Sequence, residues 1–231
     1  MHEAEEIQGV PKWALAARYT IHAETDDPAA NGPTETPGKP GYTPAELLLY
    51  GPMLQELLED RFQLRIRRVT EEAPMYAMTV AKSGLRLKPM EEGDCTPLEP
   101  GQGMKRIGPD DKPYCGWVGG RLIHGPNRAL LGGGITLEWL AQTLTAMVLD
   151  RNVIDRTGIS GSFIIRLEYA PDENTRCFGP AQFCAVDPNS DIPPGPTIFT
   201  AIEQQLGLKL EQIKGPQEHI VIDRVERPTE N

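Results

Sequence analysis

The feature that most constrains the fold is an order of elements that occurs twice, a helical stripe of apolar residues followed by two alternating segments. In the first copy, apolar residues recur at intervals of three and four and predict an amphipathic helix over 47–61. Alternating segments then begin at Leu64 and resume at Tyr76, with a turn predicted at 71–74. The pattern therefore predicts a helix followed by a β-hairpin.

The same order returns near the C-terminus. A helical stripe over 198–206 precedes a strand that opens at Leu208, a turn at 214–217 and a last strand around Ile220. The interval between the two strands is the same in both copies, which predicts an internal duplication. The alternative is that any helix followed by a hairpin would have this spacing.

A third, looser copy lies between these two. A helix is predicted over 136–148 with Thr136 as its N-cap, and strands are predicted at 153–155 and 163–167. A further hairpin is predicted around the turn at 124–127. The sequence therefore predicts an α+β fold of repeated helix-plus-β-hairpin units, with antiparallel sheets and the helices packed on one face.

Connectors rich in glycine and proline divide the chain into three parts. We predict a first α+β unit over 1–90, a disulfide-tied loop and hairpin connector over 91–135, and a second α+β region over 136–231 with two helix-hairpin units. An additional strand is predicted at 19–23, ahead of the first helix. A chain of 231 residues buries enough surface for these parts to form one compact domain.

Charge and hydropathy limit the partners of the chain. The net charge of -10 makes a nucleic-acid partner unfavourable, because binding to phosphates depends on clustered Lys and Arg. No run of apolar residues approaches the roughly 20 that a membrane-spanning helix needs, so we expect no membrane insertion. The sequence opens without the pattern of a secretory leader, and we expect the leader to be absent from this chain, as in a mature exported domain.

Cysteine usage predicts the compartment. The four cysteines are Cys95, Cys115, Cys177 and Cys184, and sequence proximity favours pairing the first with the second and the third with the fourth. Free buried thiols and a zinc site are the alternatives, although neither spacing is typical of structural zinc. Disulfides predict an extracytoplasmic protein, periplasmic or secreted, because the cytosol keeps thiols reduced.

No residue pattern predicts a catalytic, metal or cofactor site. The four histidines lack metal-ligand spacing, and the segment 158–161 lacks the G-x-S-x-G of a nucleophile elbow, so we predict a turn there. The glycines at 132–134 precede Thr136 and predict a flexible connection, with an anion site as the alternative. Two residues are candidates for a binding surface, Trp117 in a predicted loop and His124 in a predicted turn.

Three stretches carry a resemblance to a known family. They run from Met53 to Phe62, from Val153 to Gly161 and from Gln205 to Pro228. Together they resemble a large paralogous family of secreted acidobacterial proteins, a domain of unknown function, and this resemblance implies no activity. The helix-hairpin units are also similar to the short N-terminal signalling modules of secretins and TonB-dependent receptors, which are periplasmic protein-interaction domains.

These observations favour a non-catalytic binding or protein-interaction module. We expect it to recognise an envelope protein or peptide through a hairpin edge or the disulfide-tied loops. One alternative is a secreted hydrolase whose site is assembled from distant residues. Another is a sensory or structural part of a membrane assembly, which the resemblance implies because some family members are fused to membrane-anchored metallopeptidase or sensor regions.

Overall fold

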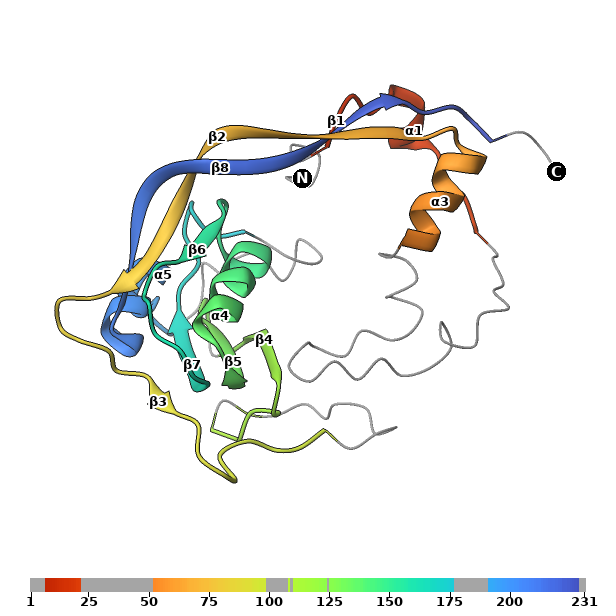
Figure 1. The fold of residues 1–231 in the computed structure, drawn as a ribbon. Helices are drawn as coiled ribbons and strands as arrows, with labels where there is room; N and C mark the ends of the chain where they lie inside the picture. Colours follow the sequence, from red (N-terminus) through yellow and green to blue (C-terminus); the bar gives the residue numbers. More distant parts are fainter. Residues whose placement is uncertain are drawn as a thin grey trace. The chain divides into compact units, whose positions relative to one another are not determined.

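The chain forms two compact units. The computed structural model describes residues 7–21, 52–98, 108, 110–123, 125–176 and 191–228. The first unit contains Met1–Ala73 and Gly215–Asn231, and the second contains Pro74–Lys214. Both ends of the chain therefore belong to the first unit, and the middle of the chain makes the second (Figure 1).

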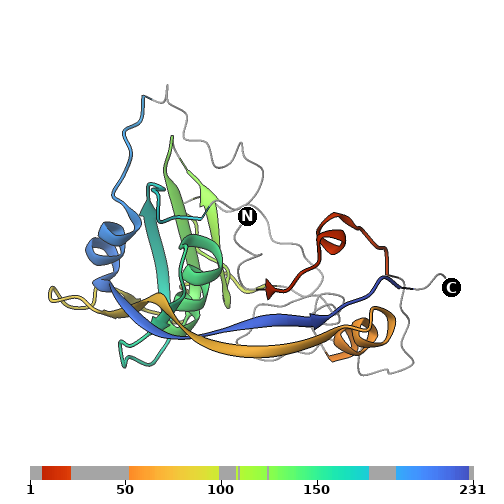
Figure 2. The ribbon, with the colours of Figure 1, turned by 90° about the horizontal axis from the view of Figure 1, so that it is seen from above.

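The second unit is built on an antiparallel sheet with the strand order β3-β7-β5-β4. Its strands are β3 (Lys88–Pro89), β4 (Trp117–Leu122), β5 (Arg128–Ile135) and β7 (Phe163–Tyr169). The strands β4, β5 and β7 lie side by side in both views (Figures 1 and 2). The hairpin predicted around 124–127 is confirmed, because β4 and β5 pair across that turn.

Two helices pack against this sheet, and each of them ends in a π-helical turn. They are α4 (Leu137–Thr143), which continues as a π-helix over Leu144–Val148, and α5 (Ile198–Ala201), which continues over Ile202–Leu206. Thr136 is the N-cap of α4, and its Oγ1 accepts a hydrogen bond from Trp139 N at 3.1 Å. The helices predicted over 136–148 and 198–206 are therefore confirmed.

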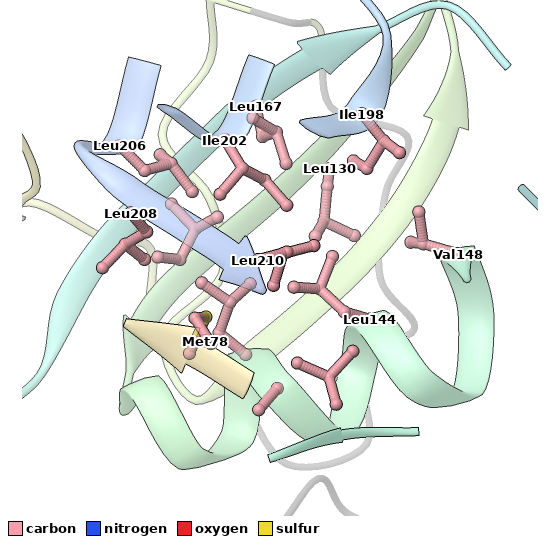
Figure 3. Packing of buried hydrophobic residues seen from close by; sticks show 14 of the residues in the cluster. Met78, Leu130, Leu144, Val148, Leu167, Ile198, Ile202, Leu206, Leu208 and Leu210 are labelled. Atoms are coloured by element: carbon pink, nitrogen blue, oxygen red, sulfur yellow. The ribbon is translucent and has the colours of Figure 1, made fainter. Parts of the chain in front are cut away.

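The hydrophobic core of the second unit lies where the sheet, the two helices and parts of three further strands meet (Figure 3). In Figure 3, Leu130 and Leu167 from the sheet face Leu144 and Ile202 from the helices. Burial of one such aliphatic side chain contributes about 1.5–3 kcal/mol. The largest fully buried side chains are Tyr76, Met78, Leu130, Ile135, Leu137, Leu140, Leu144, Leu149, Ile165, Leu167, Ile198 and Ile202.

The hairpins predicted at 71–74 and 214–217 are wrong, because the chain does not turn back at either place. The strands β2 (Arg65–Val80) and β8 (Leu208–Arg224) are continuous over 16 and 17 residues, and each runs from one unit into the other. They are neighbours in a sheet of order β1-β8-β2-β6 (Figure 1). The repeated helix-plus-hairpin unit is therefore wrong as well.

The third predicted unit is also not a helix and a hairpin, since its two strands lie in different sheets. The strand β6 (Val153–Asp155) runs parallel to β2 with Val153 opposite Tyr76, whereas β7 pairs with β5. The strand β1 (Ile7–Gln8) is parallel to β8. The α+β class is confirmed, but this sheet contains parallel pairs, which the prediction of antiparallel sheets did not include.

In the first unit, the structure describes β1, α1 (Lys12–Ala16), α3 (Pro52–Arg61) and parts of β2 and β8. The strand predicted at 19–23 is wrong for its described residues, and Tyr19 instead packs edge-on against Phe62 with ring centroids 5.2 Å apart. The helix predicted over 47–61 is confirmed from Pro52 onward, and its earlier residues lie outside the described ranges. Of the three predicted helices, α3 belongs to the first unit, whereas α4 and α5 contribute described residues to the core of the second.

Candidate functional site

Of the two predicted binding-surface residues, the structure describes Trp117. The loop predicted at this position is wrong, because Trp117 is the first residue of strand β4, the last strand in the order of its sheet, and lies opposite Gly133 of β5. Its half-buried ring covers Gly119, where an added Cβ would come within 2.2 Å of the ring. Because the next residue, Val118, packs against the core, Trp117 projects from the opposite face of β4. His124 lies outside the described residues.

The predicted disulfide between Cys95 and Cys115 is present. The backbone closes the same loop, since Cys115 N donates a hydrogen bond to the carbonyl oxygen of Thr96 at 2.9 Å. The predicted pair of Cys177 and Cys184 lies outside the described residues.

The glycines at 132–134 are not the flexible connection that the sequence predicts, because they belong to strand β5. The disulfide loop crosses the strand at Gly133, where an added Cβ would lie 2.6 Å from the carbonyl oxygen of Tyr114 and 2.8 Å from Cys95 Cβ. Glycine is required here for close packing of the loop on the sheet. The absence of a side chain therefore fixes the disulfide loop on one face of β5.

A groove of about 480 Å³ opens on the second unit, where the segment that follows β2 crosses the end of α5. The groove is lined by Ser83 and Arg86 of that segment, by Phe199, Thr200, Glu203 and Gln204 of the helix, and by Lys209 and Leu210 of β8. A groove of this volume is within the size range of small-ligand sites. We therefore take it as the candidate functional site.

The groove depends on Gly207, which ends the helix in a left-handed conformation with φ 67°. Two backbone hydrogen bonds of 2.9 Å hold the crossing segment against the helix end, from Ala81 N to Gly207 O and from Arg86 N to Leu206 O. An added Cβ at Gly207 would lie 2.0 Å from the carbonyl oxygen of Gly84. Only glycine allows the two backbones to approach this closely.

Charged side chains of both signs line the groove. Arg86 Nη1 donates to the carbonyl oxygen of Gln204 at 2.9 Å, which fixes the guanidinium beside the helix end. Lys209 forms an ion pair of 2.9 Å with Glu211, whose hydrogen bond and charge raise the pKa of Lys209, and the charge of Glu203 adds to the effect. The carboxylate of Glu203 forms no hydrogen bond or ion pair within the described part of the chain.

The apolar part of the groove is centred on Phe199. Its ring meets Tyr76 edge to face, with centroids 5.2 Å apart and planes at 66°, and Tyr76 is fully buried in the core. The aromatic ring is therefore held from behind and has little freedom to turn. Two hydroxyls, Ser83 and Thr200, stand at the sides, and the Thr200 hydroxyl accepts a hydrogen bond from the N-cap threonine of α5 at 3.2 Å.

The side chains that line the groove are hydroxyls, an amide, charged groups and apolar groups. No histidine or cysteine lines the groove, and no three metal-ligating side chains come together anywhere in the described ranges. A nucleophilic hydroxyl needs a base within hydrogen-bond reach, and neither Ser83 nor Thr200 is bonded to a described carboxylate or imidazole. The described helices include none that is long and apolar enough to cross a membrane.

A second set of polar groups acts on Tyr76. Burial raises the pKa of Tyr76, the charge of Asp150 adds to this shift, and Arg151 opposes it with its guanidinium carbon 5.6 Å from the ring centroid. Tyr76 Oη, Asp150 Oδ1 and Arg176 Nε are buried without hydrogen-bond partners among the described residues. In folded proteins, buried polar atoms of this kind are usually bonded to ordered water.

No sequence pattern predicts the groove. Arg86 and Gln204, which touch across it, are 118 positions apart in the chain. The π-helical turn that presents Glu203 and Gln204 has no sequence signature, because a normal helix has the same apolar spacing. The one available signal was Gly207, which directly follows a helical stripe and is typical of a helix C-terminus.

Comparison with known proteins gives one match. A family model described as "Protein of unknown function (DUF3738)" matches residues 1–225. No curated protein and no solved structure matches the chain. The match covers nearly the whole sequence and agrees with the predicted resemblance to a domain of unknown function.

Proposed function

The chain belongs to the DUF3738 family of proteins of unknown function, and we propose that it is a non-catalytic binding module that recognises an envelope protein or peptide outside the cytoplasm. The binding site is the groove beside α5. The observation that carries the proposal is a groove of about 480 Å³ that combines an anchored aromatic ring with hydroxyls and charges of both signs. Such a mixture is typical of sites that position a ligand by a few polar contacts on an apolar surface.

The construction of the groove supports binding. Its shape comes from backbone contacts at Gly207 and from a ring packed on the core, so little conformational entropy is lost when a ligand enters. Its walls also offer the hydroxyls of Ser83 and Thr200 and the amide of Gln204, which suit the N–H and C=O groups of a peptide.

The Cys95–Cys115 disulfide supports the extracytoplasmic location, because the cytosol keeps such pairs reduced. A location in the envelope in turn supports an envelope protein or peptide as the ligand. Fractionation of cells that produce the native protein tests this part of the proposal. Recovery of the protein in the cytoplasm with reduced Cys95 and Cys115 would contradict it.

Titration of the isotopically labelled chain with a library of short peptides, followed by NMR, tests the binding function. We expect saturable shifts at the amides of Ser83, Arg86, Thr200 and Lys209, with the peptides recovered intact by mass spectrometry. Phe199→Ala should weaken the binding. Met147→Ala, which changes a side chain of the same unit that does not line the groove, should not weaken it. A library that produces no saturable shifts at the groove contradicts the proposal, and cleaved peptides would place the protein among hydrolases.

A further inference from the structure

The groove contains two charges of opposite sign that retain hydrogen-bonding capacity. Arg86 donates to the carbonyl oxygen of Gln204, and a guanidinium has five N–H groups. The remaining donors suit the two oxygens of a carboxylate, which guanidinium groups bind in a two-point geometry. The Glu203 carboxylate has all its acceptor sites free of the described residues. The groove therefore offers the guanidinium of Arg86 to an acidic group of a ligand and the carboxylate of Glu203 to a basic group.

The third charge in the groove does not disturb this balance. Lys209 is paired with Glu211 at 2.9 Å and is also within the electrostatic reach of Glu203, so its charge is largely matched within the protein. A ligand with only negative charges would meet the carboxylate of Glu203, and a ligand with only positive charges would meet the guanidinium of Arg86. Both would place like charges side by side, which an interface disfavours.

The surface between the charges is apolar. Phe199 is fixed by its edge-to-face contact with the buried Tyr76, and Leu210 lines the same groove. An apolar side chain of the ligand would bury the ring of Phe199, which is half-exposed in the unbound protein. The groove therefore favours a ligand with an apolar body and one charge of each sign.

We infer that the ligand is a short zwitterionic peptide with apolar side chains, whose terminal carboxylate bonds to Arg86 and whose terminal ammonium group bonds to Glu203. This inference rests on the proposed function, because it names the ligand class of the same groove.

Four forms of one peptide test the inference on the full chain, namely trileucine with both termini free, N-acetylated, C-amidated, and blocked at both ends. The apolar body is the same in all four, so differences in affinity report the terminal charges alone. Isothermal titration calorimetry at neutral pH and low salt should give tighter binding for the free peptide than for either singly blocked form, by up to about fivefold, the upper range for a solvent-exposed charge pair.

Two variants assign each terminus to its partner. In Glu203→Gln, the free and N-acetylated peptides should bind equally, while the preference for a free carboxylate remains. In Arg86→Gln, the free and amidated peptides should bind equally, while the preference for a free amino terminus remains. Glu203 is exposed, so its variant tests the ammonium contact without a change in the core.

Equal affinities of all four peptides, with amide shifts at the groove, would overturn the zwitterionic ligand and leave the binding function standing. Tighter binding of a singly blocked peptide would overturn it in the same way. Failure of all four peptides to bind also overturns the inference, and the binding function falls with it only if the peptide library produces no shifts at the groove.

Discussion

Replacement of Gly207 by alanine tests whether the crossing that forms the groove depends on a missing side chain. Gly207 has φ 67°, a left-handed conformation that costs alanine about 1 kcal/mol. The added Cβ would stand 2.0 Å from Gly84 O and 2.7 Å from Arg86 N, so the two backbones must move apart. This movement breaks two hydrogen bonds of 2.9 Å that contribute about 1 kcal/mol each. The free energy of unfolding should therefore fall by about 3 kcal/mol.

Gly84→Ala is the matched control. Gly84 also has a left-handed backbone, with φ 82°, but an added Cβ there would have nothing within 4 Å. Its substitution should cost only the conformational strain of about 1 kcal/mol. Urea unfolding followed by circular dichroism measures both values, and peptide titration should show loss of groove binding in Gly207→Ala alone. Equal losses of stability in the two variants would refute the reasoning, because the close approach would then contribute nothing.

Three further predictions concern the second unit. Leu144→Ala should lower the free energy of unfolding by about 2–5 kcal/mol, because Leu144 is buried in the core. Met147, on the same π-helical turn, is 40% exposed, and Met147→Ala should change the free energy of unfolding by less than about 0.5 kcal/mol. Similar losses in the two variants would contradict the burial of Leu144. Joint replacement of Cys95 and Cys115 by alanine should cost about 3 kcal/mol in the same assay, and an unchanged stability would show that the bridge restricts nothing. Burial raises the pKa of both Tyr76 and Tyr169 above 10.0, so the free energy of unfolding should fall above that pH as the unfolded chain loses the phenol protons first. Tyr76→Phe should lessen this fall, and an undiminished fall would contradict the assignment.

The elements that the sequence predicts correctly are those that depend on near neighbours. The apolar spacing over 136–148 and 198–206 predicts helices because residues three and four apart share one face of a helix. The pair of Cys95 and Cys115 is predicted for a similar reason, since a short separation makes the two ends of a loop likely to meet. Neither argument reaches the π-helical ends of the helices, because a normal helix has the same apolar spacing.

The turn predicted at 71–74 is wrong for a reason that lies in the sheet. Pro74 lacks an N–H, and proline is normally excluded from the middle of a sheet. Tyr76 N donates to the carbonyl oxygen of Asn152 at 2.8 Å, so the N–H position of residue 74 points to the same side of β2. The strand on that side, β6, begins only at Val153. Pro74 therefore costs no ladder hydrogen bond, and it lies at the point where β2 passes from one unit into the other.

The equal spacing that predicts a duplication has a different cause, which is that β2 and β8 pair with each other. Arg67 bonds to Asp223 at 2.9 Å, and the Thr79 hydroxyl donates to the carbonyl oxygen of Lys209 at 3.5 Å. Residue numbers therefore fall along β8 as they rise along β2, which makes the two strands antiparallel. Each strand follows a helix and then crosses the same boundary between units, in opposite directions. Two such strands have the same apolar pattern as two hairpins.

This antiparallel pairing also explains the groove. It brings the end of β2 beside the beginning of β8. The segment with Arg86 follows β2, and α5 with its π-helical turn precedes β8. The residues of the groove therefore meet because the two long strands pair, and the pairing is a contact between distant parts of the chain that periodicity does not encode. A sequence interpretation with two hairpins separates Arg86 from Glu203, whereas an interpretation with one antiparallel pair places both at the same end of the ribbon and predicts a site there.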